Sequence, residues 1–358
     1  MSRILVLVGT RKGLFVLESG DDRKTWTRRG PFCESWPIYH AIYDGESGTI
    51  FVAAGSEWHG AAVWRSSDLG ETWEWSGEGL KYADGEPALS KVTGLTAAHG
   101  RLLAGVAVPG IFESTDGGVT WSHLSSLEDQ PAREEWLNAE IQPPGRLGLP
   151  AIIPNPSDPD RFFANVQGMG VWETVDGGSS WTPRNQGFRA AWPLEDPSYG
   201  YCIHKLVRSP ADAERMFAMT HVGAYVSSDG GQSYTEITEG LPSDFGFAAA
   251  AHPFDRDTAY MIPVDPEHGR YMHDGHTAVW QTRDAGSSWT RLDNGLPTDG
   301  AYLGVLREGM AMDALESPGV YFGTTTGQVF ASADEGASWQ QIADYLPGIA
   351  SVEVAVVE

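Results

Sequence analysis

Residues 66–73 read Ser66-Ser67-Asp68-Leu69-Gly70-Glu71-Thr72-Trp73, and this eight-residue motif recurs along the whole chain. A first copy at residues 19–26 keeps the serine, aspartate, threonine and tryptophan but has no glycine at its fifth position. The other copies span residues 114–121, 174–181, 227–234, 282–289 and 332–339, and each ends on an aromatic residue. The closing aromatics are separated by 47 (26 to 73) to 60 (121 to 181) residues. This period is close to the length of a four-stranded propeller blade, so seven copies predict seven blades.

The residue types of the motif suit a tight turn between two strands. The aspartate accepts hydrogen bonds from backbone N–H groups further along the turn, the glycine adopts a positive φ, and the hydroxyl residue ties the turn to itself. The closing aromatic then packs between neighbouring sheets. We therefore expect an all-β fold, a seven-bladed β-propeller, in which every aspartate of the motif has a structural role.

Hydrophobic runs within one repeat predict four strands. In the fourth repeat these are residues 150–154, 161–166, 170–174 and 181–184, and the motif lies between the third and the fourth. The first repeat starts at the equivalent of a second strand, residues 4–8, and the chain ends with an alternating β-branched run at residues 351–357. We expect the C-terminal strand to join the first blade and so to close a single propeller domain over residues 1–358.

The motif resembles the Asp-box (BNR) repeat of the sialidase superfamily, of oligoxyloglucan-cleaving hydrolases, of sortilin-type receptors and of photosystem assembly factors. The chain also resembles bacterial BNR/WD40-like proteins labelled glycosyl hydrolase or exo-sialidase. The resemblance covers nearly the whole chain and implies the propeller fold, whereas the Asp box itself is a structural turn in these families. Sialidases have six blades and a FRIP motif, whereas this sequence has seven repeats and no FRIP motif. Typical sialidase activity is therefore not expected.

Acidic residues outnumber basic residues by 48 to 24, which gives a formal net charge of −24. This charge repels phosphate backbones and anionic bilayers, so neither nucleic acid nor a membrane is an expected partner. Two cysteines are too few for a disulfide framework. The N-terminal apolar run is too short for a signal peptide or a transmembrane helix. We therefore expect a cytoplasmic protein, and the sequence leaves its oligomeric state open.

The strand order places the loops of each repeat on two faces. Loops after the second strand, and loops between repeats, share one face, which carries all the long insertions: residues 57–60, 125–146, 188–200 and 265–276. Insertions on one face of a repeat array usually form the binding surface. We therefore expect the functional site on this insertion face, at the mouth of a central channel.

Comparison of the repeats with one another identifies positions where the symmetry is broken. The residues at the end of the second strand are Arg11, Gly55, Ala107, Gln167, His221, Asp265 and Thr325. Near the start of the first strand lie His40, Lys91, Arg146, His204, Lys205 and Glu308. A purely structural ring would repeat small or apolar residues at these positions. The variety of polar side chains therefore predicts a polar cluster, for which three interpretations stay open.

In the first interpretation, the polar side chains only line a water-filled channel. In the second, His40, His204, His221 and Gln167 bind one divalent metal as cofactor, because imidazole ligands suit Mn, Fe and Zn. Oligogalacturonate lyases are similar in this one respect, since they are seven-bladed propellers with a histidine and glutamine metal site. No local motif in the sequence supports the transfer of that site.

The third interpretation is a metal-free acid–base site. Glu308 or Glu57 would supply the carboxylate, one of the histidines would be its partner, and Arg11 or Arg146 would bind an anionic group of the substrate. Lys91 and Lys205 would add to a locally positive surface in an acidic protein. An anionic small molecule such as a sugar acid is the ligand expected there.

Aromatic residues on the insertion face point toward a saccharide ligand. Most of the 14 tryptophans occupy motif or strand positions, Trp75 among them, and are expected in the core. The remaining loop positions are Trp36, Trp58, Trp136 and Trp192, with His59 beside the second of them. Their flat rings can stack on sugars or bind a protein partner. We predict a hydrolase or lyase that acts on a small saccharide or acidic metabolite by acid–base chemistry, and the alternative is a non-enzymatic scaffold or assembly protein.

Overall fold

The computed structural model describes residues 2–56, 58–84, 86, 88–130, 148–192 and 199–358. The chain forms two compact units, each of which is described separately. Unit 1 comprises Met1–Ser35 and His204–Glu358, and unit 2 comprises Trp36–Ile203. The prediction of a single domain over the whole chain stays a prediction.

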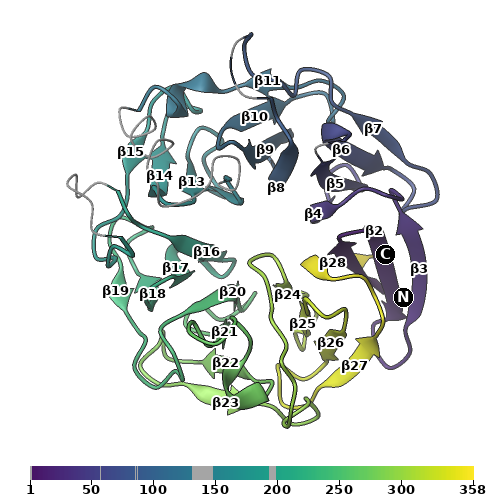
Figure 1. Cartoon of the computed structure of the whole chain (residues 1–358), viewed down its shortest axis with the longest axis vertical. Helices are drawn as coiled ribbons and strands as arrows, with labels where there is room; N and C mark the ends of the chain where they lie inside the picture. Colours follow the sequence, from purple (N-terminus) through teal and green to yellow (C-terminus); the bar gives the residue numbers. More distant parts are fainter. Residues whose placement is uncertain (1, 57, 85, 87, 131–147, 193–198) are drawn as a thin grey trace. The chain divides into compact units, whose positions relative to one another are not determined.

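Unit 1 contains four four-stranded sheets whose described strand pairs are antiparallel (Figure 1). In sheet order, the first two are β28 (Ile349–Val357), β1 (Arg3–Thr10), β2 (Gly13–Gly20) and β3 (Thr27–Phe32), and then β16 (Ile203–Ser209), β17 (Asp212–Thr220), β18 (Ala224–Ser227) and β19 (Thr235–Glu236). The other two are β20 (Gly246–Ala251), β21 (Ala259–Pro263), β22 (Val279–Thr282) and β23 (Thr290–Leu292), and then β24 (Met310–Met312), β25 (Val320–Gly323), β26 (Val329–Ser332) and β27 (Gln340–Ala343).

Unit 2 contains the remaining three four-stranded sheets. They consist of β4 (Ile38–Asp44), β5 (Thr49–Ser56), β6 (Gly60–Ser66) and β7 (Glu74–Ser76); β8 (Lys91–Ala98), β9 (Arg101–Ala107), β10 (Ile111–Ser114) and β11 (Ser122–His123); and β12 (Ala151–Pro154), β13 (Phe162–Val166), β14 (Gly170–Thr174) and β15 (Thr182–Pro183). The helical segments among the described residues are two 3-10 turns, η1 (Ser125–Leu127) and η2 (His273–Gly275). Nothing helical in the described part of the chain has the length and apolar character that a membrane crossing requires. The fold is the expected all-β, seven-bladed propeller.

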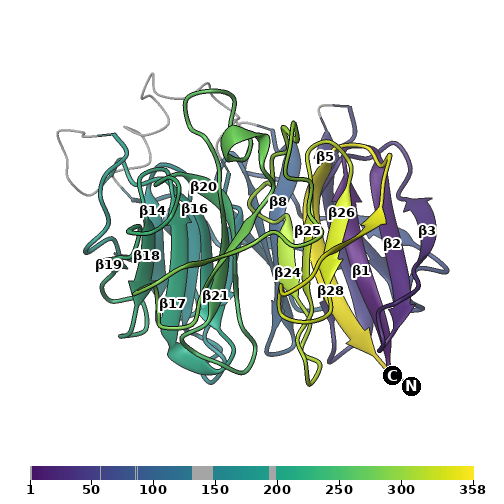
Figure 2. The same cartoon turned by 90° about the horizontal axis from the view of Figure 1, so that it is seen from below.

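The C-terminal strand completes the first blade, as the sequence predicts. Strand β28 pairs antiparallel with β1, from Arg3 opposite Val357 to Thr10 opposite Ile349 (Figure 2). A bulge shifts the register between Gly9 and Thr10. The N-terminal strand is therefore hydrogen-bonded on both edges, to β28 and to β2, and neither edge is left open for pairing with another chain.

The eight-residue motif forms the turn that its residue types predict. In residues 66–73 the Asp68 carboxylate accepts hydrogen bonds from the Thr72 hydroxyl at 2.6 Å, the Thr72 backbone N–H at 2.9 Å and the Ser66 hydroxyl at 2.8 Å. These bonds, led by the one from the Thr72 hydroxyl, lower the Asp68 pKa to about 2. The same bonds recur at five further aspartates: Asp116, Asp176, Asp229, Asp284 and Asp334.

The first copy of the motif has Arg23 where the clearest copy has Gly70. Both residues have a positive φ, 53° at Arg23 and 93° at Gly70. The side chain of Arg23 compensates for this unusual conformation, because its guanidinium donates to the buried Asp313 carboxylate at 3.0 Å and to the Ser317 carbonyl at 2.9 Å. The arginine thus links the first blade to the loop between β24 and β25.

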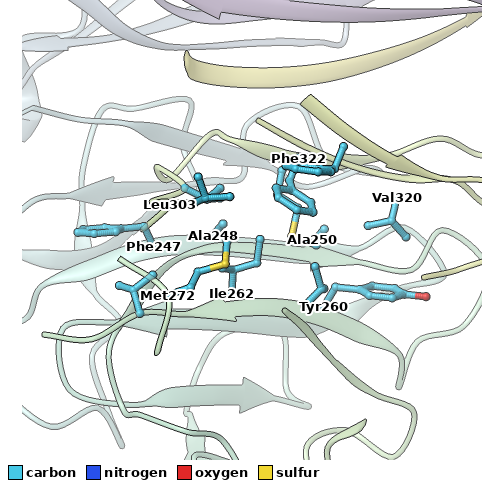
Figure 3. Close-up of a cluster of buried hydrophobic side chains, with 14 of the residues drawn as sticks. Phe247, Ala248, Ala250, Tyr260, Ile262, Met272, Leu303, Val320 and Phe322 are labelled. Carbon is cyan, nitrogen blue, oxygen red and sulfur yellow. The ribbon is translucent and has the colours of Figure 1, made fainter. Parts of the chain in front are cut away.

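An apolar cluster in unit 1 joins two neighbouring sheets and holds two loops in place (Figure 3). Phe247, Ala248 and Ala250 of β20 and Ile262 of β21 pack with Phe322 of β25. Two loop residues, Met272 and Leu303, complete the cluster, and the Met272 backbone N–H donates to the Leu303 carbonyl at 2.9 Å. The loop after β21 and the loop after β23 are therefore anchored on the core and held against each other.

Candidate functional site

Two of the predicted histidines, His204 and His221, lie side by side in unit 1. His204 belongs to β16 and His221 follows β17, and their ring centroids are 5.5 Å apart. The Nδ1 atom of His204 lies 2.6 Å from the carbonyl oxygen of Gly246. A carbonyl oxygen can only accept a hydrogen bond, so this Nδ1 carries the proton and Nε2 is the acceptor atom of the neutral ring.

The histidine pair packs against two phenylalanines at the start of β20. The His204 ring is 4.6 Å from that of Phe247 and 5.1 Å from that of Phe245, and the His221 ring is 4.9 Å from Phe245. Burial, which leaves His204 only 2% exposed, is the largest cause that lowers its pKa well below the ordinary value, and burial also lowers the pKa of His221. Both imidazoles are therefore uncharged at neutral pH.

Two arginines that the sequence analysis did not identify add positive charge here. Arg270, in the loop between β21 and β22, places its Cζ atom 5.4 Å from the centroid of the Phe245 ring. Arg307, just before β24, places its Cζ atom 5.1 Å from the centroid of Phe247. After burial, the charges of these arginines are further causes of the lowered histidine pKa values.

A cavity of about 340 Å³ opens beside the two arginines. The residues that line it include Phe247, Arg270, Tyr271, Tyr302, Arg307 and Thr325. The Tyr271 and Tyr302 rings meet edge to face at 4.9 Å, and Tyr302 is 62% exposed. Except for Phe247, these residues lie after a second strand or between repeats, which are the two kinds of loop expected to carry the site.

Lys205 and Glu308, both predicted site residues, form an ion pair. Their side chains are largely buried, with 14% and 8% exposure. Lys205 follows His204 on β16, and since successive side chains of a strand point to opposite faces, the ion pair and the histidine pair lie on different sides of that strand. The backbone carbonyl of Glu308 accepts a hydrogen bond from Val352 at 2.6 Å, which links this segment to β28.

Glu353 of β28 is a second carboxyl group near the same lysine. Burial raises its pKa to about 7, and the charge of Glu308 acts in the same direction, whereas the ammonium group of Lys205 lowers it. Glu353 pairs across the strands with Leu7 of β1, so the backbone position of its side chain is fixed by the closing strand. Lys205, Glu308 and Glu353 therefore form one electrostatic group in unit 1.

The predicted polar residues of unit 2 make local contacts. Nδ1 of His40 accepts a hydrogen bond from the Leu95 backbone at 3.1 Å, and Oε1 of Gln167 accepts one from Gly148 at 2.9 Å. Lys91 places its Nζ atom 5.2 Å from the Tyr39 ring, and burial lowers its pKa. Each of these three polar side chains therefore has a contact partner within unit 2.

The four-ligand metal hypothesis is divided between the units. His204 and His221 are neighbours in unit 1, whereas His40 and Gln167 belong to unit 2. A site that uses all four residues stays a prediction. Glu57, Trp136 and Arg146 lie outside the described residues. Arg11 is exposed in unit 1, and its backbone N–H donates to the Gly348 carbonyl at 3.1 Å.

The aromatic residues that the sequence analysis placed in the site differ in how much of their surface is exposed to solvent. Trp36 is only 8% exposed and stacks on His59, with ring centroids 4.6 Å apart. Trp58 is 91% exposed, and Trp192 is partly buried with its backbone bonded to Gly200. The expectation that Trp75 lies in the core is wrong, because it is 55% exposed. It lies on β7, an outer strand, where its ring contacts those of Trp36 and Trp64 while more than half of the residue stays exposed.

A larger cavity, of about 630 Å³, lies in unit 2 between the β4–β7 and β8–β11 sheets. Motif residues such as Ser66, Thr72 and Asp116 line it, so it is on the face opposite to the insertions. Its arginines are already paired with glutamates, Arg65 with Glu74 at 2.8 Å and Arg101 with Glu113 at 2.9 Å. The arginines of this cavity therefore have structural partners, and the cluster of histidines and arginines in unit 1 is the better candidate site.

Sequence reasoning missed Arg270, Arg307, Glu353 and the two cavity tyrosines. Arg270 and Tyr271 lie in the insertion at residues 265–276, of which the comparison of repeats named only Asp265. Arg307 directly precedes the candidate Glu308, and Glu353 is the one acidic residue within the alternating run 351–357. A charged residue in an otherwise apolar closing strand was the available signal for Glu353.

No protein-family model matches the chain. A curated relative, a xyloglucanase of Hypocrea jecorina (strain QM6a), is 24% identical over 346 residues, which is 91% of this chain and 32% of the relative. The chain thus spans about a third of the length of that relative.

Two solved structures share the fold. A GH74 enzyme of Niastella koreensis superposes with a TM-score of 0.64 at 15% identity, over 94% of this chain and 54% of the other. YCF48 bound to D1 peptide gives a TM-score of 0.55 at 16% identity, over 86% and 81% of the two chains. At these identities the likeness supports the propeller fold, and the chain is similar both to part of a glycoside hydrolase and to most of a peptide-bound protein.

Proposed function

We propose that this chain is a glycoside hydrolase-type enzyme that cleaves a saccharide by acid–base chemistry in unit 1. The observation that carries the proposal is the electrostatic group of Lys205, Glu308 and Glu353. Glu308 pairs with the ammonium group of Lys205, whereas burial raises the pKa of Glu353 to about 7. Two carboxyl groups in different protonation states are what glycosidic cleavage requires.

Each carboxyl group has one step in the proposed reaction. Glu353 donates its proton to the glycosidic oxygen as the bond between that oxygen and the sugar C1 breaks. A water molecule forms the new bond to C1, and its proton passes to the Glu308 carboxylate. The two transfers together add one water across the glycosidic bond, and exchange of protons with the solvent returns Glu308 to its carboxylate and Glu353 to its acid form. Lys205 holds Glu308 in place and in its charged form.

The xyloglucanase relative supports a saccharide as the substrate, because its similarity extends over 91% of this chain. The relative is about three times longer than the part that matches, so its activity is not transferred as a whole. We therefore propose the reaction class, hydrolysis of a glycosidic bond, and use xyloglucan oligosaccharides as the first substrates to test.

The test is the release of reducing ends from xyloglucan oligosaccharides and from oligogalacturonides by the purified full chain. Glu353→Gln and Glu308→Gln should each lower kcat by about 100-fold or more, since general acid–base catalysis contributes about 10²–10⁴. Glu74→Gln, which removes a surface carboxylate in unit 2, is the matched control and should keep full activity. The rate should also fall as the pH rises through about 7, where Glu353 loses its proton.

A peptide-binding scaffold is the second candidate. It is favoured by the similarity to YCF48 bound to D1 peptide, in which both chains are covered over more than four fifths of their length. Under this alternative no saccharide is turned over, and Glu353→Gln changes stability without affecting any reaction. Absence of turnover across both substrate sets would favour the scaffold.

A further inference from the structure

The two guanidinium groups of Arg270 and Arg307 meet at one aromatic ring. The Cζ atoms of Arg270 and Arg307 lie 6.0 Å and 5.1 Å from the centroid of Phe247. Both arginines line the cavity of about 340 Å³ in unit 1. They come from different loops, which the bond between Met272 and Leu303 holds together. The convergence of two like charges is therefore built by the fold and is not a consequence of sequence proximity.

The pairing of Arg270 is unusual for this acidic chain. Carboxylates outnumber cationic side chains by 48 to 24, and arginines elsewhere in unit 1 pair with them, as Arg23 does with Asp313 and Arg291 with Asp293. Among the described residues, the guanidinium of Arg270 contacts the rings of Phe245 and Phe247 and forms no ion pair. Aromatic faces hold a cation in position without neutralising it, so its charge stays available to an anion.

The remaining walls of the cavity suit a sugar ring. Tyr302 is 62% exposed, and its ring is fixed edge to face against Tyr271 at 4.9 Å. Exposed, oriented aromatic faces stack on the apolar faces of pyranose rings. The hydroxyl groups of both tyrosines and of Thr325 offer hydrogen-bond partners for ring hydroxyls. A volume of about 340 Å³ is at the lower end of small-molecule sites and suits one or two sugar rings.

We propose that this cavity binds a uronic acid residue, with its carboxylate between Arg270 and Arg307 and its ring against Tyr302. A planar carboxylate matches the fork of N–H groups that each guanidinium presents. The His204 ring packs against Phe245 and Phe247 and the His221 ring against Phe245. Because both imidazoles are neutral, the two arginines are the positive charges of the cluster. The inference rests on the proposed function in taking a saccharide as the ligand, and it adds that the saccharide is acidic.

Calorimetric titration of the full chain tests the proposal with three probes. D-Galacturonate carries both the ring and the charge, D-galactose carries the ring alone, and acetate carries the charge alone. We expect binding of galacturonate that weakens with added salt, and at least tenfold weaker binding of the other two. Galactose that binds as tightly as galacturonate would overturn the role of the carboxylate, and acetate that binds as tightly would overturn the role of the ring.

Three single variants locate the site. Arg270→Gln and Arg307→Gln should each weaken galacturonate binding about tenfold to 100-fold, which corresponds to the loss of charge-assisted hydrogen bonds. Tyr302→Ala should weaken the binding of galacturonate and leave the weaker binding of acetate unchanged. Arg291→Gln is the matched control, because it removes an exposed arginine on the outer strand β23 that pairs with Asp293. Unchanged galacturonate affinity in both arginine variants would overturn the proposal.

Turnover separates this inference from the proposed function. Galacturonate binding that depends on Arg270 and Arg307, without hydrolysis of any oligosaccharide, would support the acidic-sugar site and reject the enzyme. Hydrolysis that depends on Glu353, in a protein that does not bind galacturonate, would support the enzyme and reject the acidic-sugar site. Glu353→Gln should abolish hydrolysis and retain galacturonate binding if both hold.

Discussion

The ammonium group of Lys205 and the carboxylate of Glu308 form a largely buried ion pair between residues 103 positions apart in the sequence. The pair joins β16 to the segment before β24, so it links two blades of unit 1. Each charge lies in a largely buried position, and its nearest opposite charge is the other member of the pair.

Removal of the lysine charge should therefore destabilise the fold. Lys205→Met leaves the Glu308 carboxylate buried without that cation, and such a loss costs about 3–5 kcal/mol of unfolding free energy. Urea denaturation at neutral pH measures the change. The double variant Lys205→Met with Glu308→Gln removes both charges and should recover most of the stability. A single variant as stable as the unmodified chain would show that the pair has no such role.

The stability of the chain should depend on pH through Glu353. Burial raises the pKa of this carboxyl from 4.5 to about 7 in the folded state. Between these values the folded state binds more protons than the unfolded state, so the contribution is fully present below about pH 4.5 and is lost as the pH rises to about 7. The amide of Glu353→Gln does not titrate, so this variant should lack that part of the pH dependence.

Urea denaturation at a series of pH values checks this expectation. Relative to the unmodified chain, Glu353→Gln should gain stability as the pH rises from about 5 to about 8, by on the order of 3 kcal/mol at most. Glu74→Gln, at a surface ion pair with Arg65, is the control and should show no such trend. A constant difference between Glu353→Gln and the unmodified chain at all pH values would contradict the buried environment assigned to Glu353.

The fold could be predicted because its determinants repeat. The turn motif specifies its own hydrogen bonds through residues four positions apart, as the Asp68 and Thr72 bonds show. The closing strand could be predicted because β1 would otherwise have no partner on one edge. Local and periodic interactions of this kind are visible in a sequence without knowledge of distant neighbours.

The site could be predicted only in part, because its residues are brought together by loops that do not repeat. His204 and His221 lie at repeat-equivalent positions and were identified, and Lys205 and Glu308 were identified as well. Arg270 faces the same ring as Arg307 only because two loops of different length are anchored by Met272 and Leu303. The pairing of an arginine with a ring and not with a carboxylate depends on such neighbours, which spacing does not reveal.

The first turn motif should tolerate glycine better than alanine at position 23. Arg23 has a φ of 53°, and its guanidinium pairs with Asp313, whose side chain is fully buried. Either substitution leaves that carboxylate without its cation, at a cost of about 3–5 kcal/mol. Arg23→Ala also keeps a side chain in the left-handed region, which Arg23→Gly relieves by about 1 kcal/mol. Urea denaturation should therefore give Arg23→Gly a larger free energy of unfolding than Arg23→Ala. If both variants are as stable as the unmodified chain, this account is wrong.

Removal of the closing strand should make the chain aggregate. Deletion of residues 349–358 leaves one edge of β1 without hydrogen-bond partners and uncovers Ile4, Val6 and Val8, which pack with Ile349 and Val352 in the same apolar cluster. An open, apolar strand edge pairs readily with other chains. Light scattering should detect aggregates of the truncated chain at concentrations where the chain that lacks only Glu358 shows none. A peptide of residues 349–358, added in excess during refolding, should occupy the open edge and suppress the aggregation. A truncated chain that does not aggregate and keeps the melting temperature of the unmodified chain would show that β28 is dispensable for the first blade.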